Sequence, residues 1–214
     1  MSLFTLLLTT HIICGGVSLL LGVFILLSKK GDKKHKLIGT IYFYSMLITA
    51  LLAIAMTYLQ PSYFLFVTGV FTTYMLLTGK RYLKKKIICN VQPIDWILTF
   101  TMFLFGLAFI ALGSYNIFKG NYFGTVLLVF GGISLLFVYQ DYSNFKGTSS
   151  VKNFWLITHL QRMIGSYIAA STAFFVVNNT LLPGIIAWLL PTFLLVPLII
   201  IWSRKNEVKQ NKTR

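Results

Sequence analysis

Seven apolar stretches dominate this sequence and constrain its fold more than any other feature. Each is close to the ~17–25 residues that an α-helix needs to cross the ~30 Å hydrocarbon core of a bilayer. An α-helix also pairs its backbone N–H and C=O groups within one segment, as the bilayer core demands. The stretches are Leu3–Leu27, Leu37–Leu59, Tyr63–Gly79, Trp96–Phe118, Tyr122–Gln140, Phe154–Asn178 and Gly184–Ser203. We therefore expect an all-α integral membrane protein, a bundle of seven transmembrane helices.

The number of spans depends on the third stretch, which is the shortest and follows Pro61. The second and third stretches could instead form one interrupted hairpin. Only 11% of the 214 residues are charged, far below the ~25% of a soluble domain. The sequence therefore predicts a membrane protein whether it has seven spans or fewer. Because every loop is short, residues 1–203 are expected to form one transmembrane domain, followed by a basic tail at 204–214.

Lysine and arginine alternate between the predicted loops. They follow the first, third, fifth and seventh stretches, whereas the intervening loops hold only Lys119. The residues are Lys29, Lys30, Lys33, Lys34, Lys36, Lys80, Arg81, Lys84, Lys85, Lys86, Lys146, Lys152, Arg204, Lys205, Lys209, Lys212 and Arg214. By the positive-inside rule, the N-terminus is expected outside and the C-terminus inside. The net charge of +15 then reports membrane orientation, and no nucleic-acid partner is expected.

The sixth stretch contains both His159 and Arg162. An arginine in the middle of a spanning helix costs about 2.5–3.5 kcal/mol on insertion scales, so it is expected to face protein or a water-filled cavity. Residues three and four apart share a helix face, which places His159, Arg162 and Ser166 on one stripe. The nearest acids that could neutralise Arg162 are Asp95 and Asp141, at the inner ends of the fourth and fifth stretches.

The other two histidines of the chain, His11 and His35, also head stripes of small or polar residues. Tyr42 lies on the stripe of His35. At 1.5 Å per residue, His159 lies ~8 Å and Arg162 ~12 Å from the inner surface, and His35 enters from the same side. The sequence thus predicts an intramembrane pocket lined by His11, His35, Tyr42, His159, Arg162 and Ser166. As alternatives, His35 could be an interfacial group and Arg162 could extend to the inner headgroups.

Three motifs resemble those of a protein family. They are His11 with Gly15 in the first stretch, His35 with Gly39 and Tyr42 at the opening of the second, and the late His159–Met163 motif with its H-x-x-x-M spacing. The resemblance is to an uncharacterised family of bacterial multi-pass membrane proteins, a domain of unknown function. It implies a plasma-membrane location and no established activity.

These residues leave three hypotheses for the function. The first is small-molecule or proton-linked transport, or ligand binding, and the second is a redox protein that binds heme b or a quinone. His35 and His159 are the only histidine pair at similar depth, so they would be the ligands of a heme or metal. The third is a non-catalytic membrane subunit. Cys14 lies in the first apolar stretch and Cys89 in a lysine-rich loop, so no disulfide between them is expected, and neither matches a metal-binding spacing. The sequence leaves open whether the protein is an enzyme.

Overall fold

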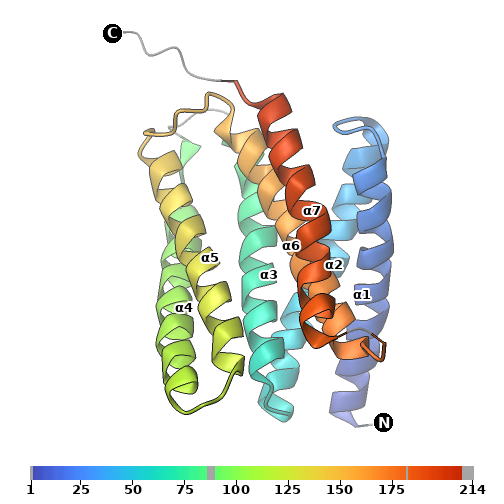
Figure 1. The fold of residues 1–214 in the computed structure, drawn as a ribbon. Helices are drawn as coiled ribbons and strands as arrows, with labels where there is room; N and C mark the ends of the chain where they lie inside the picture. The colour runs from blue at the N-terminus through green and yellow to red at the C-terminus, as the bar shows by residue number, and fades with distance from the viewer. Residues whose placement is uncertain (1, 86–89, 182, 209–214) are drawn as a thin grey trace. The chain divides into compact units, whose positions relative to one another are not determined.

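The computed structural model of the chain describes residues 2–85, 90–181 and 183–208, and in these ranges it contains seven α-helices and no β-strand (Figure 1). The helices are α1 (Leu3–Leu27), α2 (Lys33–Leu59), α3 (Tyr63–Tyr82), α4 (Pro93–Phe118), α5 (Phe123–Phe145), α6 (Phe154–Asn178) and α7 (Gly184–Asn206). The predicted all-α class is confirmed, and each predicted stretch coincides with one helix. Lys86, Cys89 and residues 209–214 of the predicted basic tail lie outside the described residues.

Six of these helices are long and apolar enough to cross a membrane; α3 is the exception in the part of the chain that the structure describes. The protein is therefore a multi-pass helical membrane protein. Helix α3 has 20 residues, with Lys80 and Arg81 in its last turn and Thr68, Thr72 and Thr78 along its length. These polar side chains lower its average hydropathy, so the seventh span and the orientation stay predictions.

Five of the helices, α2, α3, α4, α5 and α7, extend past an end of their apolar stretch. Helix α2 begins at Lys33 because the Asp32 side chain accepts the backbone N–H of His35 at 2.7 Å. Helix α4 begins at Pro93, where the Asp95 carboxylate accepts the backbone N–H of Gln92 at 2.9 Å. Such caps pair the backbone groups that a helix end leaves without partners. Local hydrogen bonding, rather than loss of hydropathy, therefore sets these ends.

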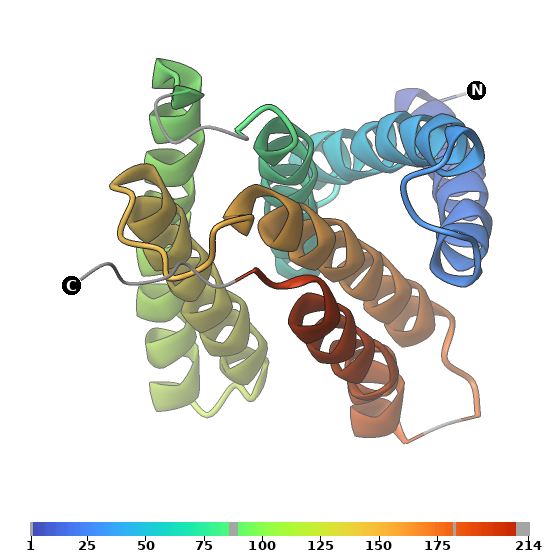
Figure 2. The ribbon, with the colours of Figure 1, turned by 90° about the horizontal axis from the view of Figure 1, so that it is seen from above.

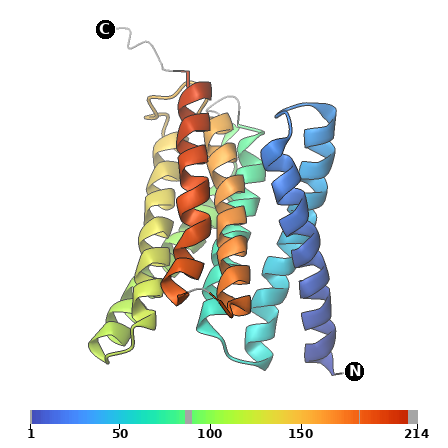
Figure 3. The same ribbon diagram turned by 45° about the vertical axis from the view of Figure 1, so that its right-hand side comes forward.

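The chain divides into two compact units, Met1–Leu76 with Ile164–Leu198 and Leu77–Met163 with Ile199–Arg214, which we call unit 1 and unit 2. Helices α3, α6 and α7 each contribute one part to each unit. In unit 1, α1 packs antiparallel to α2 (Figures 2 and 3). In unit 2, α4 packs against α5 (Figure 1). The single domain expected from the sequence stays a prediction.

Small residues bring α4 and α5 of unit 2 into close contact. A Cβ atom on Gly113 would lie 2.9 Å from the carbonyl oxygen of Gly124, and one on Gly131 would lie 3.0 Å from the carbonyl oxygen of Gly106. The turn between these helices contains Gly120 at φ +76°, a conformation that favours glycine. In a bilayer, where apolar side chains gain little by leaving lipid, such close approach is a main source of helix association.

Candidate functional site

The centre of the candidate site is a buried ion pair in unit 2. Arg162 of α6 donates from Nη2 to Oδ1 of Asp141 of α5 at 2.9 Å, and both side chains are fully buried. The same nitrogen donates to the carbonyl oxygen of Phe137 at 2.9 Å, and the guanidinium lies 4.0 Å from the centre of the Phe137 ring. Removing two charges from water costs several kcal/mol for each ion, so a pair such as this one needs further hydrogen bonds.

Two more helices supply hydrogen bonds to the Asp141 carboxylate. The Tyr82 hydroxyl of α3 donates to Oδ1 at 2.8 Å, and the Thr99 hydroxyl of α4 donates to Oδ2 at 3.2 Å. Asp141 thus receives donors from α3, α4 and α6. A buried carboxylate with several donors is a satisfied charge, and a satisfied polar network fixes the relative register of the helices that carry it.

Three further side chains extend this network towards one end of α5 and α6. Asn144 donates from Nδ2 to the Tyr82 hydroxyl and to Oγ1 of Thr158, both at 3.2 Å. Gln140 accepts from Arg162 at 3.4 Å and donates to Gln161 at 2.8 Å. We refer to the whole set as the Arg162–Asp141 network. Its members are Tyr82, Thr99, Gln140, Asp141, Asn144, Thr158 and Arg162.

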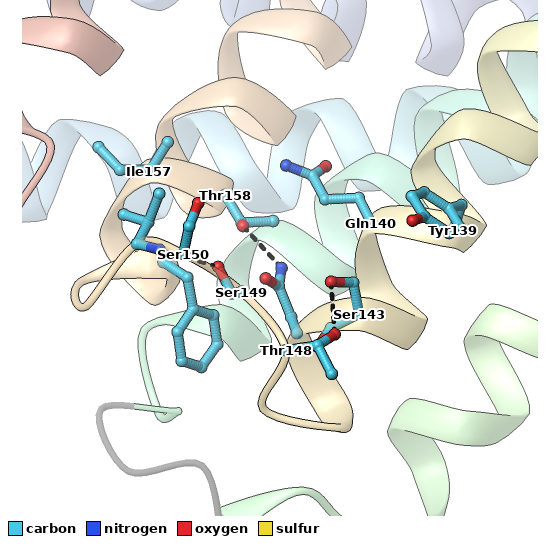
Figure 4. A pocket seen from close by; sticks show the side chains of 11 residues that line it. Tyr139, Gln140, Ser143, Thr148, Ser149, Ser150, Ile157 and Thr158 are labelled. Carbon is cyan, nitrogen blue, oxygen red and sulfur yellow. Dashed lines mark hydrogen bonds between the residues drawn. The ribbon is translucent and has the colours of Figure 1, made fainter. Parts of the chain in front are cut away.

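A pocket of about 290 Å³ opens beside this network, at the ends of α5 and α6 and the connection between them (Figure 4). It is lined by Tyr139, Gln140, Ser143, Asn144, Thr148, Ser149, Ser150, Val151, Phe154, Ile157 and Thr158. Eight of these eleven carry a hydroxyl or amide group, and none carries a formal charge. Gln140, Asn144 and Thr158 belong to both the lining and the network, so the pocket is one hydrogen bond away from the buried ion pair.

His159, a predicted pocket residue, is held by its ring nitrogen Nδ1, which donates to the carbonyl oxygen of Gly79 at 2.8 Å. The contact joins α6 to α3 within unit 2. A Cβ atom on Gly79 would lie 3.0 Å from Cβ of Arg162, so the small residue allows this approach. The bond orients the imidazole through one nitrogen and fixes which nitrogen carries the proton.

The other four predicted pocket residues lie in unit 1. Tyr42 and Ser166 are buried and their hydroxyls lie 2.9 Å apart. His11 donates from Nδ1 to the carbonyl oxygen of Thr49 at 3.0 Å. Nδ1 of His35 is buried and has no hydrogen-bond partner among the described residues. The structure thus joins Tyr42 to Ser166, whereas His159 and Arg162 lie in unit 2, and the single pocket expected from the sequence stays a prediction.

The two acids considered as partners of Arg162 have different roles. Asp141 makes the ion pair, whereas Asp95 binds Arg81 through Nε and Lys85 through Nζ, the latter at 2.6 Å. Burial lowers the pKa of Lys85 below its ordinary value, and the hydrogen bond to Asp95 opposes that effect.

Within residues 2–85, 90–181 and 183–208, no three His, Cys, Asp or Glu side chains gather where they could hold a metal ion. His35 and His159, the heme or metal ligands considered from the sequence, fall in different units. Cys14 is a half-buried free thiol, and Cys89 lies outside the described residues.

Most members of the Arg162–Asp141 network are not predicted by the sequence. Tyr82, Thr99, Gln140, Asn144 and Thr158 were not among the candidates. A signal was present for two of them, because Asn144 lies three residues after Asp141 and Thr158 four residues before Arg162, so each shares a helix face with a member of the ion pair. Tyr82 and Thr99 carry no such signal, because they lie on other helices.

These features define a multi-pass helical membrane protein with a buried, hydrogen-bonded ion pair beside a polar pocket. Residues 8–90 match the model of a family described as a predicted membrane protein (DUF2306), a domain of unknown function. The match confirms the resemblance to an uncharacterised membrane protein family; it includes the motifs of His11 and His35, while the His159–Met163 motif lies beyond it. No curated protein and no solved structure matches the chain.

Proposed function

We propose that this membrane protein binds a small, neutral, hydroxyl-bearing solute in the pocket at the ends of α5 and α6. The proposal rests on one observation: Gln140, Asn144 and Thr158 belong both to the pocket lining and to the Arg162–Asp141 network. The buried ion pair holds these three side chains in place before a ligand arrives. Such preorganisation reduces the entropy that binding must overcome.

The chemistry of the lining selects the class of ligand. Hydroxyl and amide groups both donate and accept hydrogen bonds, as do the hydroxyls of polyols and sugars. A charged ligand would need an opposite charge in the lining, and none of the eleven lining side chains has one. The volume of about 290 Å³ is just below the ~300–1,000 Å³ typical of small-molecule sites. These features favour a solute of a few carbon atoms.

Proton-linked transport of that solute is the second candidate. The Asp141 carboxylate is fully buried and bonded to Tyr82, whose hydroxyl also accepts from Asn144 of the pocket lining. A chain of two hydrogen bonds thus leads from the pocket to an acid inside the membrane. Asp, Glu and His inside spanning helices are typical of proton relays; in this chain of bonds Asp141 and Tyr82 are the groups that exchange a proton, and Asn144 orients the Tyr82 hydroxyl. Uptake by proteoliposomes that depends on a proton gradient would distinguish transport from binding alone.

Equilibrium dialysis against glycerol, erythritol, ribose and myo-inositol tests the proposal, with acetate and ethylammonium as charged comparisons. We expect at least one neutral solute to bind. Ser150→Trp, which fills the pocket, should weaken that binding at least ~10-fold, equivalent to ~1.4 kcal/mol. Lys152→Trp is the matched control, because it adds the same ring to the same connection at a residue outside the lining. Binding of only the charged solutes, or equal binding by both variants, would contradict the proposal.

We also infer that all seven helices span the plasma membrane, with the N-terminus outside. An odd number of spans places the two termini on opposite sides, so α3 decides the topology. Its 20 residues extend ~30 Å at 1.5 Å per residue, which matches the hydrocarbon core. Thr68, Thr72 and Thr78 are buried, so their hydroxyls avoid lipid and the low average hydropathy of α3 does not prevent insertion.

Fusions of a phosphatase that is active only outside the cytoplasm check this topology. Joined after Gln60 or Gly120, the reporter should be active, whereas joined after Lys84 or Asn206 it should be inactive. The basic residues of the corresponding loops, which favour the cytoplasmic side, are the reason for this expectation. Equal reporter activity after Gln60 and after Lys84 would mean that α3 does not cross, and the reverse pattern at all four sites would mean that the N-terminus lies inside.

A further inference from the structure

One carboxylate serves two cations where α3 ends and α4 begins in unit 2. Oδ1 of Asp95 accepts from both Arg81 and Lys85, and Oδ2 accepts the backbone N–H of Gln92 at 2.9 Å. The side chains of Lys85 and Asp95 are only 3% exposed, whereas that of Arg81 is 24% exposed. The cluster therefore carries one surplus positive charge, and Arg81 is its accessible member.

The surplus charge is poorly compensated within the protein. The chain has four acidic residues against 19 lysines and arginines, and Asp141 is already bonded to Arg162. Burial lowers the pKa of Lys85, and the neighbouring Arg81 lowers it further, while the bond to Asp95 opposes both effects. A second anion beside Arg81 and Lys85 would supply the missing compensation.

The positions of both cations are fixed before any anion binds. The Lys85 ammonium lies 5.1 Å from the centre of the Tyr82 ring and 5.6 Å from that of Phe145. Nη2 of Arg81 donates to Oε1 of Gln92 at 3.2 Å. A planar guanidinium beside an ammonium suits a phosphate group, because the guanidinium can donate two parallel hydrogen bonds to two phosphate oxygens.

Aromatic residues beside the cluster indicate the depth of the lipid headgroups. Trp96 directly follows Asp95, and its ring lies 5.1 Å from that of Phe145 and 6.2 Å from that of Tyr142. Trp96 is 39% exposed and Tyr142 51% exposed. Partly exposed tryptophan and tyrosine at helix ends are typical of the membrane interface. Farther along α4, Ile97 is also exposed, as expected of a surface that contacts acyl chains.

From this arrangement we propose that Arg81 binds the phosphate of an anionic phospholipid headgroup, with the buried Lys85 ammonium adding positive charge behind it, while the exposed apolar surface of α4 contacts its acyl chains. Basic clusters at the cytoplasmic ends of membrane helices are suited to such headgroups. The site is separate from the pocket at the ends of α5 and α6, since neither cation lines that pocket.

Thermal unfolding of the protein in neutral detergent with added lipid tests the proposal. Phosphatidylglycerol should raise the Tm by about 3–6 °C over phosphatidylcholine when present at ~10 times its Kd. Arg81→Gln should lose more than half of this rise, and Arg81→Lys, which keeps the charge but loses the two parallel donors, should retain more of it than Arg81→Gln. Each variant is compared with its own Tm in phosphatidylcholine, so a less stable variant still reports the effect of the lipid.

Lys119→Gln is the matched control, because Lys119 ends α4 ~36 Å along the helix from Asp95, at 1.5 Å per residue. It should keep the full rise. Inorganic phosphate and glycerophosphoglycerol, which lack acyl chains, should produce little of it. An undiminished rise in Arg81→Gln would overturn the proposal, and an equal rise with inorganic phosphate alone would assign the site to a soluble anion instead.

Discussion

Arg162→Ala is expected to abolish most of the folded, monodisperse protein recovered in detergent. The substitution leaves the Asp141 carboxylate, which is fully buried, without its compensating cation. Removing one partner of a buried ion pair typically costs about 3–5 kcal/mol, a large part of the ~5–15 kcal/mol that stabilises a typical folded protein. Size-exclusion chromatography of the solubilised protein, together with the Tm of any folded fraction, measures the effect.

Two comparisons make this result specific to the ion pair. Lys152→Ala removes an exposed loop cation and should leave the folded yield unchanged. The double variant Arg162→Met with Asp141→Leu removes both charges and should recover much of the lost yield, because apolar residues can replace a buried pair at little cost. If Arg162→Ala and Lys152→Ala gave equal yields, the arginine would reach the lipid headgroups and not Asp141.

The helices were largely predictable from the sequence because one physical requirement, pairing of the backbone inside lipid, acts on every span. The stretches Leu3–Leu27 and Phe154–Asn178 coincide with α1 and α6. Helix α5 is different: it was expected to end at Gln140 but continues to Phe145. Its last turns carry Asp141 and Asn144, whose polarity lowers the hydropathy although both side chains are buried. An average of hydropathy cannot register burial among polar partners.

The partners of Arg162 were less predictable, because a sequence does not rank contacts between helices. Asp95 lies in the first turn of α4 and Asp141 near the end of α5, and the sequence alone makes both acids equally suitable. The structure separates them through their neighbours. Asp95 bonds to Arg81, in the last turn of α3, and to Lys85, which follows α3. Asp141 instead bonds to Arg162. Which acid pairs with Arg162 depends on how α3, α4 and α6 pack against α5.

The packing of α4 against α5 provides the second large expected effect, through Gly124→Ala. A Cβ atom at Gly124 would overlap the carbonyl oxygen of Gly113 and lie 2.8 Å from Cγ1 and 2.9 Å from the backbone nitrogen of Ile117. Two of these three atoms belong to the backbone of α4, so a change of side-chain rotamer cannot relieve the clash. The short connection around Gly120 also limits how far the two helices can separate. Overpacking of this kind costs about 1–3 kcal/mol or more.

Gly132→Ala is the matched control, because it makes the same substitution in the same helix where a new Cβ atom meets nothing within 4 Å. There alanine should leave stability unchanged or raise it by up to ~1 kcal/mol, since glycine is the weaker helix former. Thermal unfolding of both variants in one detergent separates the two effects. We expect Gly124→Ala to have a lower Tm than the unsubstituted protein and Gly132→Ala an equal or higher one. Only direct backbone contact makes one added methyl group costly at residue 124 and harmless at residue 132. Equal Tm values for the two variants would therefore show that α4 and α5 lie farther apart in the membrane than in this structure.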